Sequence, residues 1–207
     1  MLREGFQYGA GFAAAAVLTG LLTQPAWAAP MVILGLFTMY FFRDPERVVP
    51  AGPGLVVSPA DGKVVDVRQV EQDGHQRNRV SIFLSVMDVH VNRSPVAWMI
   101  REVRYSPGRF HAAWKQEASI ENERNVITVE TESGDVVFKQ IAGVLARRVV
   151  CWKKSGEHVE RGERIGLMKF SSRMDVFLDP AWDLAVRAGE RVRGGVSVLA
   201  RLKGAAQ

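Results

Sequence analysis

The sequence predicts a mostly β domain, built as a sandwich or barrel-sandwich hybrid, that follows a hydrophobic helical hairpin. Three observations support this prediction. The segment before Arg43 holds two long apolar runs. From Pro45 onward, short valine-rich runs alternate with glycine, proline and aspartate, as in all-β folds. The chain has 207 residues and is 47% hydrophobic, which suffices for one sizeable core and leaves little room for two.

The two apolar runs extend from Gly9 to Leu22 and from Ala26 to Phe42. Each is near the ~20 residues that span a hydrocarbon core. Pro25 lies between them, and proline ends a helix because it lacks a backbone N–H. We therefore expect residues 1–43 to form a helical hairpin that associates with a membrane.

Charge predicts the side of the membrane. Arg3 at one end of the hairpin and Arg43 and Arg47 at the other would lie on the same face, which the positive-inside tendency makes cytoplasmic. We expect location at the inner cell membrane, with the remaining domain on the cytoplasmic side. The alternative is a cleaved signal peptide, indicated by Arg3 and the small-residue pattern at 26–28. That alternative leaves the second apolar run unexplained.

Residues 44–207 are expected to form the second domain. One stretch, Phe110–Glu123, fits either a short helix or a loop. The expected strands are Leu55–Val57, Lys63–Val67, Val80–Leu84, Val126–Glu130, Val136–Ile141, Val149–Trp152, Arg164–Phe170, Met174–Leu178 and Val196–Leu199.

The composition restricts the partners. The formal net charge of +5 favours an anionic partner, either a lipid surface or a nucleic acid. No run of five basic residues occurs, which argues against nucleic acid, and the apolar runs favour a lipid surface. Cys151 is the only cysteine, so an internal disulfide and a multi-cysteine metal site are excluded, and we predict no metal. We interpret Cys151 as a small buried hydrophobic residue.

Three polar segments are not explained by the strand pattern. In the first, Asp61 precedes Gly62, which fits a tight turn and also an orienting carboxylate. In the second, His90 follows an apolar strand among several polar residues, and it is the best base candidate of the four histidines. The third holds the adjacent serines Ser171 and Ser172, which taken alone indicate a polar turn.

Seven short blocks in this order resemble the short, bacterial and archaeal branch of the phosphatidylserine decarboxylase family. The resemblance extends from about Phe41 to Leu178. The blocks are Phe41-Phe42-Arg43-Asp44-Pro45, Ser58-Pro59-Ala60-Asp61-Gly62, Asp88-Val89-His90-Val91-Asn92-Arg93, Glu121-Asn122-Glu123-Arg124-Asn125, Gln140-Ile141-Ala142-Gly143, Ala146-Arg147-Arg148 and Gly162-Glu163-Arg164-Ile165-Gly166.

The resemblance implies a self-cleaving enzyme. In the family, a serine attacks the carbonyl before it, and the resulting ester breaks down to leave a pyruvoyl group. Here that serine is Ser172, with cleavage between Ser171 and Ser172. The products are a β chain of residues 1–171 and an α chain of residues 172–207. The pyruvoyl group derived from Ser172 is the covalent cofactor, which condenses with the substrate amine and acts as an electron sink.

The resemblance also implies the roles of three further residues. His90 is the base that activates Ser172, and Asp61 is the acid that orients His90. Arg173 beside the pyruvoyl is a candidate contact for the substrate's phosphate or carboxylate, although a solvated arginine explains it equally well. The substrate is phosphatidylserine in an anionic membrane, the product is phosphatidylethanolamine, and the cleaved chains stay together as a heterodimer that forms a homodimer in turn.

The sequence departs from the family at two positions. Ser171 stands where the family usually has glycine, and a side chain there narrows the conformations open to the scissile bond. Arg93 stands where longer members have a second histidine.

Other functions are compatible with parts of the pattern. Lys169 in Leu167-Met168-Lys169-Phe170 resembles the modified lysine of biotinyl and lipoyl carrier domains. A phosphocarrier or membrane adaptor would use His90 as the phosphate acceptor and would not need Ser172. A pyruvoyl enzyme that acts on a free amino acid is a third alternative, against which the apolar amino terminus argues.

Overall fold

The computed structural model describes residues 1–72, 74–113, 117–144, 148–169 and 172–204. The elements, in chain order, are α1 (Arg3–Leu22), a 3-10 turn η1 (Pro25–Ala28), α2 (Ala29–Phe41), β1 (Leu55–Val57), β2 (Gly62–Gln72), β3 (His75–Leu84), β4 (Val91–Arg93), β5 (Trp98–Ser106), α3 (Ala118–Glu121), β6 (Arg124–Thr131), β7 (Gly134–Ala142), β8 (Val149–Cys151), β9 (His158–Val159), β10 (Arg164–Met168), β11 (Ser172–Leu178), β12 (Trp182–Leu184), β13 (Arg191–Val192) and β14 (Val198–Leu202). The chain divides into two compact units, Met1–Glu46 and Arg47–Gln207.

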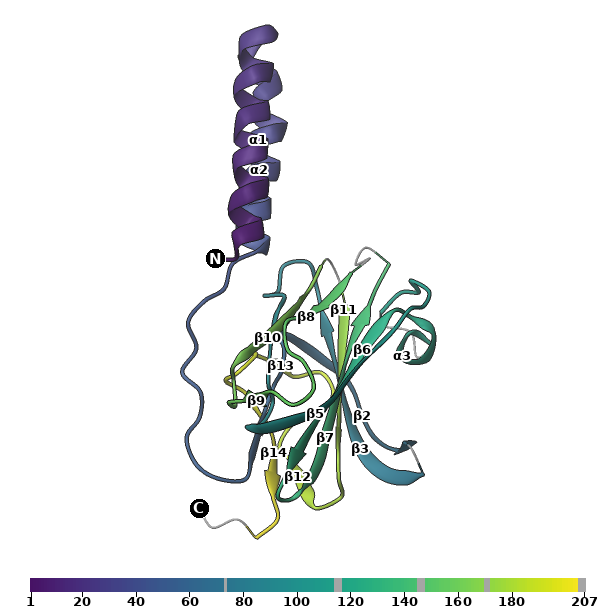
Figure 1. The fold of residues 1–207 in the computed structure, drawn as a ribbon. Coiled ribbons are helices and arrows are strands. Elements are labelled where there is room, and N and C mark those ends of the chain that lie inside the picture. The colour runs from purple at the N-terminus through teal and green to yellow at the C-terminus, as the bar shows by residue number, and fades with distance from the viewer. Residues whose placement is uncertain (73, 114–116, 145–147, 170–171, 205–207) are drawn as a thin grey trace. The chain divides into compact units, whose positions relative to one another are not determined.

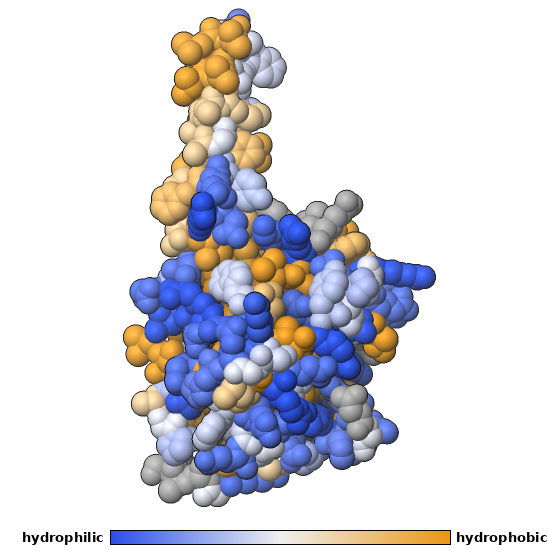
Figure 2. Space-filling view, in the orientation of Figure 1, coloured by the Kyte–Doolittle hydropathy of each residue, from blue (hydrophilic) through white to orange (hydrophobic). Residues whose placement is uncertain are grey.

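The first unit is the predicted helical hairpin. Helices α1 and α2 run side by side and are joined by η1, which begins at Pro25 (Figure 1). The helices approach closely where Gly35 has no side chain, since a Cβ there would lie 3.3 Å from Cβ of Phe12. Most of the hairpin's side chains are apolar and exposed (Figure 2). Among the described helices, α1 is long and apolar enough to cross a membrane, and the segment Pro25–Phe41 is a shorter apolar helix.

The second unit is mostly β, as predicted. Its largest sheet is curled and has the strand order β13-β2-β3-β11-β7-β6-β5-β9 (Figure 1). Two smaller sheets have the orders β1-β14-β12 and β4-β10-β8. One large apolar core joins side chains from these sheets, among them Val56, Ile82, Ile127, Ile165 and Met174.

Strand β11 lies in the middle of the large sheet, antiparallel to both β3 and β7. Every one of its residues is buried. Because successive side chains of a strand point to opposite faces, its two faces have different surroundings. Met174 and Val176 join the large core, whereas Phe177 packs in a separate small cluster on the other face.

The structure contains five strands that were not predicted, namely β4, β5, β9, β12 and β13. Strand β5 (Trp98–Ser106) was not predicted, because Arg101, Glu102 and Arg104 interrupt its apolar pattern and only one side chain, Ile100, is fully buried. The stretch 110–123, predicted as either a short helix or a loop, is mainly irregular where it is described and contains the short helix α3 at Ala118–Glu121.

Gly62 at the start of β2 is expected to tolerate no side chain. A Cβ at this position would lie 2.3 Å from the backbone oxygen of Phe83 on the paired strand, which cannot withdraw without breaking the sheet. We expect Gly62→Ala to destabilise the domain by about 3 kcal/mol, the upper end for overpacking. Gly74→Ala is the control, because Gly74 has φ +77° but open space around it, so that only ~1 kcal/mol is expected. Equal melting temperatures for the two variants would contradict this account.

Candidate active site

Ser172 is the first residue of the central strand β11. Its backbone lies opposite Leu84 of β3 and Ala142 of β7. The side chain is fully buried, and its Oγ has no hydrogen-bond partner among the described residues. A sealed hydroxyl of this kind is uncommon and calls for an explanation beyond packing. Ser171, the other half of the predicted scissile bond, lies outside the described residues.

His90 precedes β4 and is also fully buried. Its Nδ1 lies 2.9 Å from the backbone oxygen of Asp88. A carbonyl oxygen only accepts hydrogen bonds, so Nδ1 carries the proton in this contact. A neutral ring then has its lone pair on Nε2, which is the form that a general base needs.

The segment that carries His90 lies over the same face of the sheet as Ser172. Gln140 of β7 donates a hydrogen bond of 2.8 Å to Oδ1 of Asn92, two residues after His90. Gln140 and Ala142 lie on the same face of β7, and Ala142 is the residue paired with Ser172. The backbone N–H of Met168 also donates to the oxygen of His90, at 3.2 Å. The structure thus brings His90 and Ser172 to one interior region.

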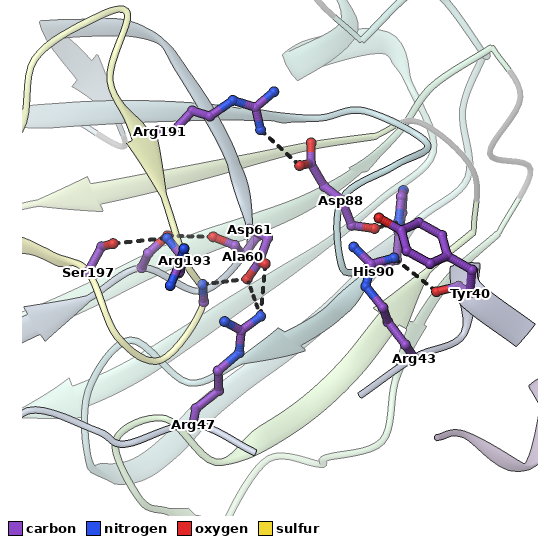
Figure 3. Close-up of polar contacts among 12 residues, drawn as sticks. Tyr40, Arg43, Arg47, Ala60, Asp61, Asp88, His90, Arg191, Arg193 and Ser197 are labelled. Atoms are coloured by element: carbon purple, nitrogen blue, oxygen red, sulfur yellow. Dashed lines mark hydrogen bonds and ion pairs between the residues drawn. The ribbon is translucent and has the colours of Figure 1, made fainter. Parts of the chain in front are cut away.

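Asp61 has other partners than those expected. Its carboxylate accepts hydrogen bonds from Nη2 of Arg47, at 2.8 and 3.1 Å (Figure 3). It also accepts one from the backbone N–H of Gly194, at 2.8 Å. Nδ1 of His90 bonds instead to the Asp88 carbonyl, and the orienting role of Asp61 toward His90 stays a prediction. The Arg47–Asp61 ion pair is largely buried, with side-chain exposures of 12% and 16%.

The Arg173 side chain points away from that of Ser172. The two are consecutive strand residues, so their side chains point to opposite faces of the sheet. The Arg173 guanidinium is 2% exposed, and it donates to Oδ1 of Asp175 at 2.6 Å and to Oγ of Ser81 at 2.8 Å. Oδ2 of Asp175 accepts a further hydrogen bond from Ser119. Arg173 is therefore not a solvated arginine, and its side chain lies on the opposite face of the sheet from the Ser172 hydroxyl. Its predicted contact with the substrate is not tested by these contacts.

Two polar residues whose roles the sequence did not predict hold the strand next to Ser172. The Nδ2 of Asn122 donates to the oxygens of His111 and Ala142, and its Oδ1 accepts from the N–H of His111. The neighbouring Glu123 accepts from the N–H of Val149 and bonds to the N–H of Ala142 through its own backbone oxygen. Both belong to one of the seven family blocks, which was the only signal for them.

The loop before His90 is fixed by Asp88. Its Oδ2 accepts from the backbone N–H of Ser85, and its Oδ1 accepts from Arg191 (Figure 3). Arg93, where longer family members have histidine, is 7% exposed and donates to the oxygen of Gly162 at 2.9 Å. The arginine thus ties β4 to the turn before β10.

Cys151 is partly buried against the large core, which confirms its hydrophobic interpretation in part. Burial raises the pKa of its thiol, so that little of the reactive thiolate is present near neutral pH. We expect iodoacetamide at pH 8 to react with the Cys151 thiol several-fold more slowly than it reacts with the thiol of glutathione. Unfolding the protein in urea should remove this difference. A folded-state rate equal to that of glutathione would contradict this.

Among the described residues, no cluster of three His, Cys, Asp or Glu could hold a metal ion.

A family model described as "Phosphatidylserine decarboxylase" matches residues 34–200. The match therefore covers α2 from residue 34 onward, strands β1 to β13, the first part of β14, and the region around Ser172 and His90.

Individual relatives are similar over nearly their whole length, and those named here are called phosphatidylserine decarboxylase proenzyme. The protein from Solibacter usitatus is 51% identical over 201 residues, which cover 97% of this chain and 96% of the relative. The protein from Symbiobacterium thermophilum is 46% identical, with coverages of 97% and 94%. The protein from Pelobacter propionicus is 43% identical, with coverages of 96% and 95%.

Proposed function

The chain belongs to the phosphatidylserine decarboxylase family, and from this membership we propose that it cleaves itself at Ser172 and then decarboxylates phosphatidylserine to phosphatidylethanolamine. It is an enzyme of the carboxy-lyase type, which excludes the non-enzymatic carrier and phosphocarrier alternatives. The observation that carries the self-cleavage is the sealed hydroxyl of Ser172. An acyl shift within the chain needs no access from solvent, so burial is no obstacle to it.

The first step of the proposed cleavage is an acyl shift from nitrogen to oxygen. The Oγ of Ser172 attacks the carbonyl carbon of residue 171, and its proton passes to Nε2 of His90. The C–N bond then breaks, and His90 returns the proton to the nitrogen of Ser172. The product is an ester in which the Ser172 oxygen carries the acyl group of residue 171.

The second step forms the pyruvoyl group. Loss of the α-proton of Ser172 expels residue 171 as a carboxylate and leaves a dehydroalanine. This becomes an imine, which water hydrolyses to a ketone with release of ammonia. The pyruvoyl group then supplies an electron sink for the electron pair released when carbon dioxide leaves the substrate.

Within this proposal, Asp61 acts as a positioning residue. It belongs to the β chain, and it binds the backbone of Gly194, which belongs to the α chain. It also holds Arg47 at the beginning of the domain. The contact would therefore fix the two chains together after cleavage. Arg173, with its buried partners on the opposite face of the sheet, is not included among the proposed substrate contacts.

The two cleaved chains are expected to stay associated. Strand β11 bonds to β3 and β7 along its whole length, and β13 and β14 pair with β2 and β1. Since these ladders and the core cross the proposed cleavage site, both chains should co-elute in size-exclusion chromatography and separate only in denaturant. Dissociation of the small chain under native conditions would contradict the fold or the cleavage site.

The hairpin is proposed to anchor the enzyme at the cytoplasmic face of the inner membrane. The substrate is a diacyl lipid, and an enzyme docked at the bilayer acts on its head group without extracting the lipid. The length and apolar surface of α1 support this, as do the exposed apolar side chains of α2.

The substrate is tested with two carboxyl-labelled compounds. The full-length protein in lipid nanodiscs is expected to release labelled carbon dioxide from phosphatidylserine and to leave free serine unchanged. Release from free serine alone would favour a pyruvoyl enzyme that acts on an amino acid. Release from neither by a fully cleaved protein would contradict the proposed function.

A further inference from the structure

Three buried amide side chains form a chain of hydrogen bonds across the interior. Asn125 of β6 donates from Nδ2 to Oε1 of Gln140 at 3.0 Å. Gln140 of β7 donates from Nε2 to Oδ1 of Asn92 of β4 at 2.8 Å. All three side chains are buried, with Asn92 and Gln140 fully inaccessible and Asn125 4% exposed.

The direction of this chain is determined by a backbone group. Nε2 of Gln140 also lies 3.2 Å from the oxygen of Val150, which only accepts hydrogen bonds. The amide nitrogen of Gln140, and not its oxygen, must therefore face the Val150 oxygen. The same nitrogen donates to Asn92, so the Asn92 atom that it contacts must be the oxygen Oδ1. Consequently Nδ2 of Asn92 is the last donor of the chain. It is buried and has no hydrogen-bond partner among the described residues.

Gly166 allows the close approach of the central amide. A Cβ at Gly166 would lie 2.8 Å from Nε2 of Gln140 and 2.2 Å from the oxygen of Val150. Gly166 is also the residue of β10 that pairs with Asn92. The absence of a side chain at this point thus permits the hydrogen bond that holds Asn92 in place.

The free end of the chain lies over the same face of the large sheet as Ser172. Gln140 pairs with Met174 and Ala142 pairs with Ser172, so the Gln140 and Ser172 side chains share one face as diagonal neighbours. Diagonal neighbours in a sheet are about 7–8 Å apart, and Asn92 is in contact with Gln140 on this face. Asn92 is also two residues from His90 on the same short segment. The unpartnered donor therefore lies in the region that holds the sealed hydroxyl.

A buried donor without an acceptor costs free energy, so its presence on the same face of the sheet as an unpartnered nucleophile needs a reason. The proposed acyl shift supplies one. When Ser172 attacks, the π electrons of the carbonyl move onto its oxygen, and a negative charge develops where none existed before. Donors that are already fixed toward such a charge accelerate the reaction without reorganising.

We propose that Asn92 is a catalytic residue of self-cleavage, whose Nδ2 donates a hydrogen bond to the oxyanion formed on the carbonyl of residue 171. Asn92 keeps its proton throughout, while the Ser172 proton passes to His90 and back. The amide chain through Gln140 holds the donor in its orientation. This inference rests on the proposed function, because it assigns a role within the same cleavage.

Two variants remove the donor. Asn92→Asp keeps the size of the side chain and the acceptor for Gln140, but its ionised carboxylate cannot donate. Asn92→Ala removes the whole amide. Cell-free synthesis of the full chain, followed by mass spectrometry over time, gives the cleavage rate. We expect both variants to cleave roughly a hundredfold more slowly than the native chain, as for loss of one oxyanion donor.

Asn125→Ala is the matched control. It removes the other end of the same buried chain of amides and leaves Asn92 and Gln140 in contact. We expect it to lower the melting temperature of the protein about as much as Asn92→Ala but to cleave at nearly the native rate. If the Asn125 and Asn92 variants slow cleavage in proportion to their loss of stability, Asn92 acts only in folding, and the inference is wrong.

Hydroxylamine identifies the step that is slowed, because it cleaves esters but not peptides. If Asn92 stabilises the oxyanion, the uncleaved Asn92 variants contain no ester and remain whole in hydroxylamine. Fragments released by hydroxylamine would show that the acyl shift still occurs, and would overturn the inference. If the native chain and the Asn92 variants cleave at the same rate, only this inference is contradicted. A native chain that never cleaves contradicts the proposed function itself.

Discussion

Replacing Ser172 by alanine is expected to leave one uncleaved chain without decarboxylase activity. The substitution removes the attacking oxygen, so neither the ester nor the pyruvoyl group can form. It should not harm folding, because the Oγ of Ser172 makes no hydrogen bond among the described residues. Removing a buried, unpaired hydroxyl is neutral or slightly stabilising, within about 1 kcal/mol. Gel electrophoresis and carbon dioxide release on the same sample measure both effects.

Ser81→Ala is the matched control for this variant. Ser81 is another fully buried serine, on the adjacent strand β3, but its Oγ bonds to Arg173 on the opposite face from Ser172. We expect this variant to be less stable by about 1 kcal/mol and to cleave normally. A Ser172→Ala protein that still appears as two chains would place the scissile bond elsewhere.

Replacing His90 by glutamine is expected to slow self-cleavage by roughly 10²–10⁴-fold, the usual contribution of a general base. Glutamine is similar in length and can still donate to the Asp88 carbonyl, but it offers no basic nitrogen to the Ser172 hydroxyl. The precursor should therefore fold and accumulate. A time course of cleavage in cell-free synthesis measures the rate.

His75→Gln makes the same chemical change at an exposed position, the first residue of β3. It should leave both the cleavage rate and the decarboxylase activity unchanged. If His90→Gln cleaves as fast as His75→Gln, another group removes the proton from Ser172, and the tautomer set by Asp88 has no part in the reaction.

The elements that were predicted correctly are those whose burial is visible in the residue types. Val80–Leu84 and Met174–Leu178 are apolar almost throughout because the sheet is covered on both faces, and they lie in β3 and β11. Strand β5 has one fully buried side chain, Ile100, and its charged residues resemble a loop. A strand that is held mainly by its backbone ladder leaves little trace in the sequence.

The contacts of the site could not be predicted from the sequence. His90 lies in one of the family blocks, whereas Ser172 follows the last block and was assigned from the serine that cleaves itself in the family. Their catalytic roles stay predictions. The partner of Asp61 could not be predicted, because Arg47 lies in an irregular segment and no pattern relates the two. His90 is oriented by the backbone carbonyl of residue 88. Because every residue type has this carbonyl, the sequence contains no signal for the contact.

The face to which the Arg173 side chain points could have been predicted from the sequence. Once Ser172 is placed in a strand, alternation requires the next side chain to point to the other face. Adjacency in the sequence suggested a shared site, whereas the strand geometry separates the two side chains. The buried ion pair with Asp175, its second neighbour along the strand, follows from the same alternation.

The working enzyme is expected to arise by cleavage before Ser172, and intact-mass analysis of the purified native protein tests this cleavage. We expect two chains, residues 1–171 and residues 172–207, with the smaller one blocked to Edman degradation and carrying the mass of a pyruvoyl group in place of serine. A single, full-length chain that decarboxylates phosphatidylserine would contradict it.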